Sequence, residues 1–329
     1  MTKIKVFASR IFPECGINLL KEADFLVTEW SEDRPMTQDE LIGEAKKQHA
    51  LFCTVSDKID KRFLNQCSHI QIISQFAVGF DNIDISEATK LGIPVGYTPG
   101  AMTDATADTA FGLIIATARK MFYMHKKIIN GRWDYFRPTG DLGIELKNKT
   151  LGIFGMGRIG IEMARRCKGA YNMQVIYHDL NRDSAAEKEL NARYVDFDSL
   201  LAQSDILSVH CQLSNQTRGI FNHEVFGKMK PTSVFINTSR GSVHNEEDLI
   251  EALKTGEIWG AGLDVTNPEP MHLDNPLLKM ENVSILPHIG SATEEARNAM
   301  SVMAAQNIIE YYRHKKVPHL VNPEVLKSS

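Results

Sequence analysis

The fold is decided by the stretch Thr150-Leu-Gly-Ile-Phe-Gly-Met-Gly-Arg-Ile-Gly-Ile-Glu-Met-Ala-Arg-Arg-Cys167, in which a short apolar run, a glycine-rich turn and a helical pattern follow without a break. The glycines Gly155, Gly157 and Gly160 have the spacing G-x-G-x-x-G. In such a strand, turn and helix, the first glycine allows a tight turn, the second lets backbone approach a pyrophosphate, and the third lets the helix pack on the strand. We expect the N–H groups and the positive dipole end of the helix that begins near Arg158 to face phosphates.

A second strand, Met173-Gln-Val-Ile-Tyr-His-Asp179, ends in an acid nineteen residues after Gly160. A carboxylate at that position accepts hydrogen bonds from both ribose hydroxyls of an adenosine. The spacing therefore favours a dinucleotide site over a turn without a ligand. It also favours Asp179 as the ribose acceptor over an ordinary acid at a strand end.

The composition is that of an ordinary globular protein, with 43% hydrophobic and 24% charged residues. The 329 residues are enough for two domains. The net charge of −4 gives no electrostatic reason to expect binding to nucleic acid or to an anionic membrane. The first ten residues have too short an apolar core for a signal peptide, and no apolar stretch reaches the length of a bilayer span. We therefore expect a cytoplasmic protein.

The cysteines and histidines do not predict a metal site or a disulfide framework. The five cysteines are widely scattered without C-x-x-C spacing, and the eleven histidines form neither H-x-x-x-H nor H-E-x-x-H. We expect reduced, largely buried cysteines and no metal.

The first hundred residues alternate between short apolar runs and helical patterns. The expected strands are 3–8, 25–29, 50–55, 70–74 and 93–97, and the expected helices are 16–23, 37–47 and 60–66. This alternation predicts a small open sheet covered by helices. Residues 79–84 follow a strand, and loops beyond strand ends in such sheets are where ligands bind.

Residues 103–129 form a helical pattern that is apolar almost all round. Such a helix must be buried against another domain or another subunit. We interpret it as a linking helix that also serves a dimer interface, and a buried core helix without that second role is the alternative. An aromatic, turn-rich loop follows at 131–138.

The remainder of the chain predicts a doubly wound α/β fold. After the quoted strand and the strand 173–179, further strands are expected at 192–195, 206–210, 233–237, 260–265 and 283–286, with helices at 197–203, 223–229 and 246–255. Seven strands with helical crossovers describe a parallel sheet whose cofactor lies across the switch point. We interpret the helical stretch 292–314 as returning to the first domain.

We therefore predict two Rossmann-like doubly wound parallel-sheet domains, of which the smaller is discontinuous. A substrate-binding domain is expected over residues 1–100 and 291–329, and an NAD-binding domain over residues 101–290.

Three polar residues stand after successive strands of the second sheet, at the edge where the cofactor is expected. They are Arg240, Glu269 and His288. An arginine binds a carboxylate through a two-pronged charge-assisted contact, a histidine transfers a proton near neutral pH, and a glutamate orients the histidine. Each residue alone also fits a role as an ion-pair, turn or capping residue. Together they supply what the reduction of a 2-oxo acid requires.

The chain resembles the D-isomer-specific 2-hydroxyacid dehydrogenases, and within them the glyoxylate/hydroxypyruvate reductase branch. The resemblance covers nearly the whole chain through the motifs Val78-Gly79-Phe80-Asp81-Asn82-Ile83-Asp84, Thr98-Pro99, Met102-Thr103-Asp104-Ala105-Thr106-Ala107-Asp108, the glycine turn, Ser239-Arg240-Gly241, Gly262-Leu263-Asp264-Val265, Glu269-Pro270 and Pro287-His288-Ile289-Gly290-Ser291. It implies NAD(P)H-dependent reduction of a small 2-oxo acid to the D-2-hydroxy acid, and the reverse.

The resemblance also implies the role of each residue. The matching arginine of the family holds the carboxylate and carbonyl oxygens of the substrate, the histidine donates the proton and the glutamate pairs with the histidine, which implies catalytic roles for Arg240, Glu269 and His288. The backbone of Val78 and Gly79 closes on the substrate carboxylate. The implied cofactor contacts are Thr106, Gly155, Gly157, Arg158, Ile159, Gly160, Asp179, Thr238, Ser239, Arg240, Asp264, His288 and Gly290.

Two departures from the family pattern stand out. Where the family commonly has Arg-Gly-x-Val-Val-Asp-Glu, this chain has Arg240-Gly-Ser-Val-His-Asn-Glu246. Gly100 follows Thr98-Pro99 where many relatives have Asp or Asn. The first departure bears on the surroundings of Arg240, and not on the role that the resemblance implies for it.

The cofactor is expected to be NAD, with NADP possible. Asp179 repels a 2′-phosphate, whereas the nearby Arg182 has a flexible guanidinium that can lie over one. We expect the like-charge penalty from Asp179 to outweigh that contact.

Other functions remain as alternatives. D-3-phosphoglycerate dehydrogenase is disfavoured because Cys53-Thr-Val-Ser-Asp-Lys-Ile-Asp60 resembles glyoxylate reductases and offers little charge for a phosphate. Phosphite or formate dehydrogenase is more distant. A non-enzymatic NAD-sensing corepressor is disfavoured because no long charged or disordered extension is seen at either terminus. A homodimer is expected from the apolar helix.

Overall fold

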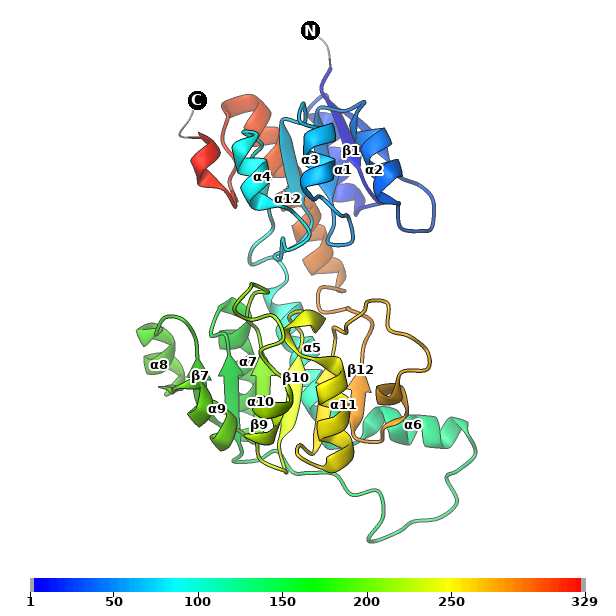
Figure 1. The fold of residues 1–329 in the computed structure, drawn as a ribbon, viewed down its shortest axis with the longest axis vertical. Helices are drawn as coiled ribbons and strands as arrows, with labels where there is room; N and C mark the ends of the chain where they lie inside the picture. The colour runs from blue at the N-terminus through cyan, green and yellow to red at the C-terminus, as the bar shows by residue number, and fades with distance from the viewer. Residues whose placement is uncertain (1–2, 327–329) are drawn as a thin grey trace. The chain divides into compact units, whose positions relative to one another are not determined.

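The computed structural model describes residues 3–326, which divide into two compact units. The first unit comprises residues up to Met102 together with those from Ala292 onward, and the second comprises Thr103–Ser291. The first unit therefore contains both ends of the colour scale in Figure 1, blue and red.

The first unit is built on a five-stranded parallel sheet with the order β2-β1-β3-β4-β5. Its strands are β1 (Lys5–Ala8), β2 (Leu26–Glu29), β3 (Ala50–Cys53), β4 (Ile72–Gln75) and β5 (Val95–Gly96). Its helices are α1 (Glu14–Glu22), α2 (Gln38–Ala45), α3 (Lys61–Gln66), α4 (Ile85–Lys90) and α12 (Glu294–His314), with the 3-10 turn η3 (Pro323–Leu326). Because the order of the strands reverses at β1, the ligand crevice of this sheet is expected at the carboxyl ends of β1 and β3.

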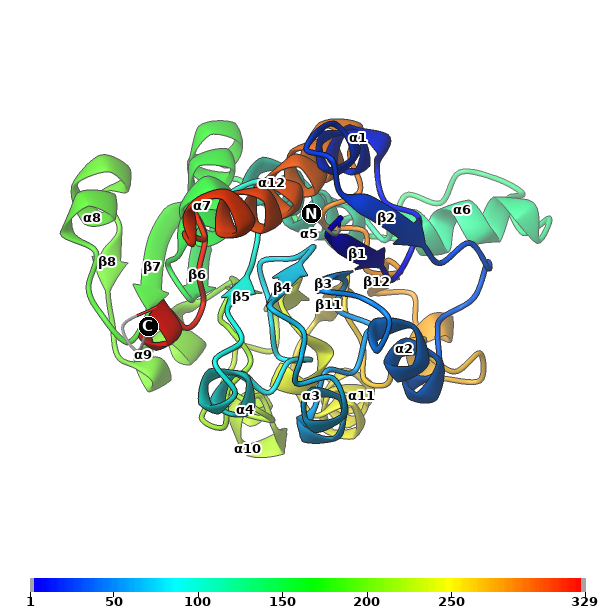
Figure 2. The same cartoon turned by 90° about the horizontal axis from the view of Figure 1, so that it is seen from above.

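Helices cover both faces of this sheet, which is why its central strands are buried. Leu41 of α2 and Phe63 of α3 pack with Phe7 and Leu51 on one face. The residues of α1 and α12 pack on the other face with those of β1, β3 and β4. Figure 2 shows α1 and α12 together on one side of the strands and α2, α3 and α4 on the other.

The helix α4 is a finding that the sequence analysis missed. It begins at Ile85, directly after the expected loop 79–84, and the side chain of Asp84 accepts a hydrogen bond from the N–H of Glu87. This contact caps the helix N-terminus. With six residues, the helix is too short to produce a recognisable apolar period.

The helix α12 completes the first unit, which confirms that the smaller domain is discontinuous. A side chain at Gly16 of α1 would overlap the backbone of Ser301, so the two helices approach closely. The hydroxyl of Ser74 at the end of β4 donates a hydrogen bond of 2.8 Å to the carbonyl of Ala304. The side chain of Thr293 caps the helix by accepting from the N–H of Ala296.

The second unit is built on a seven-stranded parallel sheet with the order β12-β11-β10-β9-β6-β7-β8, which confirms the predicted doubly wound fold. Its strands are β6 (Thr150–Phe154), β7 (Gln174–His178), β8 (Arg193–Tyr194), β9 (Ile206–Val209), β10 (Val234–Asn237), β11 (Gly260–Leu263) and β12 (Val283–Ile285). Its helices are α5 (Thr103–Ala118), α6 (Met121–Ile129), α7 (Arg158–Tyr171), α8 (Ser184–Leu190), α9 (Phe197–Gln203), α10 (His223–Gly227) and α11 (Glu246–Thr255), with the 3-10 turns η1 (Gly241–Val243) and η2 (Pro276–Lys279).

Two cores hold the second sheet. Leu113 of α5 and Met163 of α7 pack with Ile153 and Tyr177 on one face. On the opposite face, the helices α9, α10 and α11 pack against residues that include Phe235 of β10. The order of the strands reverses at β6, which places the glycine turn at the switch point.

The expectation of one continuous buried helix over 103–129 is wrong. The helix α5 ends at Ala118, and α6 begins at Met121 after Lys120 adopts a left-handed φ of +52°. The helix α5 is largely buried, whereas α6 buries none of its residues in this chain. The periodic pattern of apolar residues continues through the break. It depends only on side-chain type, so it gives no sign of the backbone turn at Lys120. Figure 1 shows α6 as a separate helix.

Among the residues from 3 to 326, no helix combines the length and the apolar character that crossing a bilayer requires.

Candidate active site

The glycine turn has the geometry that its sequence predicts. Gly155 adopts a φ of +99°, and a Cβ there would lie 2.7 Å from the backbone nitrogen of Cys211. A Cβ on Gly160 would lie 2.5 Å from the carbonyl oxygen of Gly155, so a side chain there would separate α7 from the strand. Gly157, in contrast, faces open space within 4 Å. Close packing of the turn and the helix therefore requires glycine at 155 and 160. The open space at Gly157 leaves room for a ligand.

The N-terminus of α7 lies at this open side of the turn. Gly157 is the N-cap residue and offers no side chain to satisfy the N–H groups that start at Arg158. Uncapped N–H groups at a helix N-terminus bind phosphates readily.

Asp179 lies beside the same turn. Its carboxylate accepts hydrogen bonds from the N–H of Met156 at 2.7 Å and from the N–H of Leu180 at 2.6 Å. The guanidinium of Arg182 pairs with the carboxylate of Glu187 at 2.8 and 3.0 Å. The carboxylate of Glu187 also accepts from the hydroxyl of Tyr177 at 2.8 Å, which holds it in place for Arg182.

Other residues that the sequence assigns to the cofactor lie near the carboxyl ends of the strands. The hydroxyl of Thr238 is buried and has no hydrogen-bond partner in the described part of the chain, and a buried polar group of this kind requires a partner. Thr106 donates a hydrogen bond of 3.1 Å to the carbonyl of Gly290. The open side of the glycine turn, the uncapped helix and the orphaned hydroxyl all fit a dinucleotide.

Arg240 stands on a loop that Asn237 organises. The amide nitrogen of Asn237, the last residue of β10, donates to the carbonyl of Arg240 at 2.9 Å. Its amide oxygen accepts from the N–H and hydroxyl of Ser239 at 2.9 and 2.8 Å. The same amide nitrogen lies 3.1 Å from Nδ1 of His244. Because an amide nitrogen only donates, Nδ1 of His244 accepts this hydrogen bond.

Glu269 and His288 form a hydrogen-bonded pair. Nδ1 of His288 lies 2.8 Å from Oε2 of Glu269, and the N–H of Thr266 donates to Oε1 at 3.0 Å. Burial raises the pKa of Glu269, but the hydrogen bond and charge of His288, the N–H of Thr266 and the charge of Arg240 lower it more, so that the net pKa is below its usual value. An ionised carboxylate only accepts hydrogen bonds, so Nδ1 carries the proton and Nε2 is left for the substrate.

Asp264 holds the backbone that carries His288. His288 adopts a left-handed φ of +55°, which is unfavourable for a residue with a side chain. Its N–H donates to the carbonyl of Asp264 at 2.9 Å, and the N–H groups of Ile289 and Gly290 donate to the Asp264 carboxylate at 2.7 Å each. Burial raises the pKa of Asp264, although these two N–H groups oppose the rise. These contacts offset the strain at His288.

Sequence analysis missed some residues that support the site. Glu246 is buried, and its carboxylate accepts from the N–H of Asn267 at 3.0 Å and from the side chain of Asn275 at 2.6 Å, which ties down the loop before Glu269. Asn237, which organises the loop of Arg240, is the second supporting residue that the sequence analysis missed. The only signal in the sequence is that both flank the Arg240 motif.

The second unit thus brings together Arg240, Glu269 and His288, which follow the neighbouring strands β10, β11 and β12. Val78 and Gly79 belong to the first unit, where they follow β4. The catalytic and binding roles of all five stay predictions at this point.

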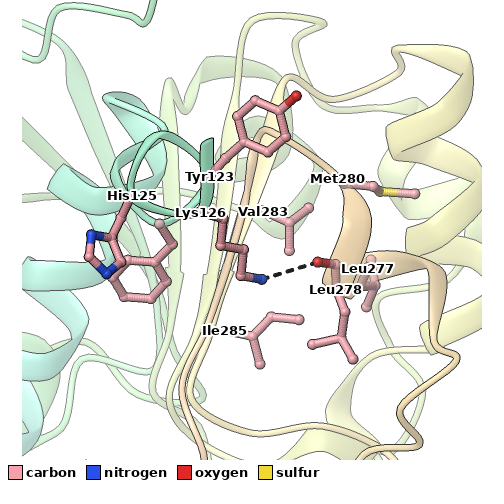
Figure 3. Close-up of a pocket in the computed structure, with 9 residues that line it drawn as sticks. Tyr123, His125, Lys126, Leu277, Leu278, Met280, Val283 and Ile285 are labelled. Atoms are coloured by element: carbon pink, nitrogen blue, oxygen red, sulfur yellow. Dashed lines mark hydrogen bonds between the residues drawn. The ribbon is translucent and has the colours of Figure 1, made fainter. Parts of the chain in front are cut away.

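A cavity of about 220 Å³ lies elsewhere in the second unit. Figure 3 shows it between α6 and the segment around η2 and β12, where Lys126 donates a hydrogen bond of 3.3 Å to the carbonyl of Leu278. Its other lining residues are mostly apolar and include none of Arg240, Glu269 and His288. His125 also lines it, but none of the three residues assigned to catalysis does, so we do not assign the reaction to this cavity.

Comparison with known proteins agrees with this geometry. The sequence profile described as "D-isomer specific 2-hydroxyacid dehydrogenase, NAD binding domain" matches residues 111–290. The chain belongs to this family. The D-2-hydroxyacid dehydrogenase is accordingly an NAD(P)-dependent oxidoreductase that acts on the CH–OH group of its substrate.

Similar proteins cover the whole length of this dehydrogenase. The glyoxylate reductase of Thermococcus litoralis is 44% identical over 99% of both chains. The crystal structure of the TT0316 protein from Thermus thermophilus has a TM-score of 0.90 at 33% identity, covering 97% of this chain and 100% of that chain. An NADPH-dependent glyoxylate/hydroxypyruvate reductase from Sinorhizobium meliloti, in complex with NADP and malonate, has a TM-score of 0.85 at 28% identity and 98% coverage of both chains.

Proposed function

We propose that this dehydrogenase reduces glyoxylate or hydroxypyruvate to the D-2-hydroxy acid with NADH, and catalyses the reverse reaction. The observation that carries the proposal is the hydrogen bond of 2.8 Å between His288 and Glu269, beside the charge of Arg240. An ionised acid holding a histidine next to an arginine is what the reduction of a carbonyl beside a carboxylate needs. The similarity to the glyoxylate reductase of Thermococcus litoralis supports this choice of substrate.

Each residue then has a defined task. The guanidinium of Arg240 binds the substrate's carboxylate and 2-oxo oxygen, which neutralises the charge that develops there. His288, protonated at both nitrogens, gives the proton on Nε2 to the 2-oxo oxygen, while Glu269 stabilises the imidazolium through Nδ1. The reduced nicotinamide supplies the hydride to C2 when it is bound.

The two units divide these tasks in the proposal. The second unit binds the cofactor through the glycine turn, Asp179 and Thr238, and supplies the reacting groups. The first unit contributes the backbone of Val78 and Gly79, which binds the substrate's carboxylate. The open space at Gly157 and the orphaned hydroxyl of Thr238 support the cofactor assignment.

A kinetic panel tests the function. NADH consumption is followed with glyoxylate, hydroxypyruvate, pyruvate and 3-phosphohydroxypyruvate, for the wild type and for His288→Gln. Glyoxylate or hydroxypyruvate is expected to give the highest kcat/KM, and the substitution to lower kcat by about 10²–10⁴ because it removes the proton donor. Tight NADH binding without turnover of any 2-oxo acid would favour an NAD-sensing protein, and preference for the phosphorylated acid would favour a phosphoglycerate dehydrogenase.

The protein is proposed to be a homodimer. The helix α6 and the loop after it expose Ile128, Ile129, Trp133, Tyr135 and Phe136, and the last of these is 84% exposed in the single chain. Several large exposed apolar side chains on one helix and the loop that follows it favour an interface. Light scattering at micromolar concentration is expected to give twice the chain mass for the wild type, and a monomer mass for the double variant Ile129→Glu, Trp133→Glu. A cytoplasmic location also stays a prediction, which cell fractionation tests.

A further inference from the structure

A network of buried amides lies beneath the loop that carries Val78 and Gly79. Gln75 is the last residue of β4 and is 0% exposed. Its amide nitrogen donates to the carbonyl of Gly79 at 3.2 Å and to the side-chain oxygen of Asn82 at 2.7 Å. Its amide oxygen accepts from the thiol of Cys53 at 3.1 Å. Both N–H groups of a fully buried amide are thus donated to the same loop, and its oxygen is bonded to the neighbouring strand β3.

Asn82 anchors the far end of the same loop to the end of β3. Its amide nitrogen donates to the carbonyls of Thr54 at 3.1 Å and Asp57 at 2.8 Å. Its own carbonyl accepts from the N–H of Ile59 at 3.0 Å. Because the nitrogen of Gln75 donates to the oxygen of Asn82, and the nitrogen of Asn82 donates to two carbonyls, the orientation of both amides is determined.

The loop is also fixed on its other side. The carbonyl of Ala77 accepts a hydrogen bond of 2.9 Å from the N–H of Thr98. The peptides between Ala77 and Gly79 are therefore held between one contact to the main chain near Thr98 and one to the side chain of Gln75. A fully satisfied buried polar network of this kind specifies one backbone geometry, which an apolar contact cannot do.

We propose that Gln75 and Asn82 are positioning residues, which hold the backbone of Val78 and Gly79 in the orientation that receives the substrate's carboxylate. This inference rests on the proposed function. Neither side chain needs to touch the substrate, because each acts through the main chain of the loop. Loss of the network is therefore expected to weaken substrate binding and to leave cofactor binding unchanged.

The test compares Gln75→Met with a matched control in the same unit. Methionine keeps the length of the side chain and removes both donors to the loop. The control is Asn322→Leu, because Asn322 is a buried amide that is also fully bonded, to Thr89, Ile93 and Val95, and has none of its bonds to the loop. Both variants lose hydrogen bonds in the interior, so their melting temperatures are expected to fall.

Steady-state kinetics and hydrogen exchange then separate positioning from stability. For Gln75→Met, KM for glyoxylate is expected to rise roughly tenfold to a hundredfold, with the Kd for NADH from fluorescence titration unchanged. Amide exchange of the peptide that covers 76–84 is expected to become faster. Asn322→Leu is expected to change neither quantity. An unchanged KM in folded Gln75→Met, or an equal rise in Asn322→Leu, would overturn the proposal.

Hydrogen exchange keeps this proposal distinguishable from the proposed function. A wild type that turns over no 2-oxo acid would contradict the proposed function. Amide exchange of 76–84 that stays slow in Gln75→Met would contradict the positioning role, whatever the activity. If Gln75→Met fails to fold, Gln75→Leu replaces it, because leucine is shorter than methionine and likewise has no donor for Gly79.

Discussion

Nδ1 of His288 lies 2.8 Å from Oε2 of Glu269, whose second oxygen is held by the N–H of Thr266. The pKa of Glu269 is below its usual value, so the carboxylate stays ionised through neutral and mildly acidic pH. It therefore accepts the hydrogen bond from Nδ1 of His288 and leaves Nε2 for the substrate of the proposed reaction.

The first prediction concerns Glu269→Gln. The amide keeps the size of the side chain but can donate a hydrogen bond to Nδ1 of His288, which the carboxylate cannot, so the proton is no longer held on Nδ1. We expect kcat for glyoxylate reduction to fall roughly 10²-fold, with the Kd for NADH unchanged. Steady-state kinetics and fluorescence titration measure the two quantities, and a wild-type kcat in the variant would contradict the role of Glu269.

Arg240→Lys tests the two-pronged contact with the substrate. Lysine keeps the charge but lacks the planar pair of donors that matches a carboxylate. We expect kcat/KM for the best 2-oxo acid to fall about a hundredfold. Arg165→Lys is the control, because Arg165 pairs with Glu189 on the surface, and its kinetics should match those of the wild type. Wild-type kinetics in Arg240→Lys would remove Arg240 from substrate binding.

The choice of cofactor depends on Asp179. Its carboxylate lies at the glycine turn, and Arg182 is engaged with Glu187, so repulsion of a 2′-phosphate is expected to dominate. NADH is expected to be preferred over NADPH by roughly tenfold to a hundredfold in kcat/KM, and Asp179→Ser is expected to reduce that ratio. A wild type that prefers NADPH would show that Asp179 does not face the ribose.

His244 makes stability depend on pH. Burial lowers its pKa from 6.5 to about 4 in the folded chain. Between these values the unfolded chain binds a proton that the folded chain does not, so stability is lost as the pH falls from about 6.5 toward 4. The contribution amounts to about 2 kcal/mol between pH 7 and pH 5.

The measurement for this prediction is urea unfolding at pH 7 and pH 5 for the wild type and His244→Val. The variant has no titrating group at this position. The difference between its free energies of unfolding at pH 7 and pH 5 is therefore expected to be about 2 kcal/mol smaller than that of the wild type. Equal differences in the two proteins would show that His244 is not shielded from protonation in the folded state.

The sequence predicted most of the second sheet because its signals are local. Apolar runs between helical patterns mark β6, β7 and β9 directly, and Gly155 and Gly160 are required sterically within their own turn. The convergence of Arg240 and His288 followed from a general rule, since residues after successive parallel strands meet at one edge of the sheet.

What escaped prediction depends on contacts between distant parts of the chain or on a single backbone angle. The contacts of Glu246 to Asn267 and Asn275 join an acid at the start of a helix to a loop more than twenty residues later, and the sequence around Glu246 does not indicate that loop. The break between α5 and α6 rests on the left-handed φ of Lys120, a residue type that helices accept readily.

The position of α12 has a consequence for how the chain folds during synthesis. The first 102 residues contain all five strands of the first sheet, yet Ala304 and Ile308, which cover one face of it, follow about two hundred residues later. A nascent chain that has just emerged up to Met102 therefore exposes the apolar face of β1, β3 and β4, while Thr103–Ser291 has its complete core once it leaves the ribosome. The second unit can thus finish folding before the first unit, although synthesis of the first unit begins earlier. The first 102 residues therefore stay exposed to aggregation for longer than the rest of the chain.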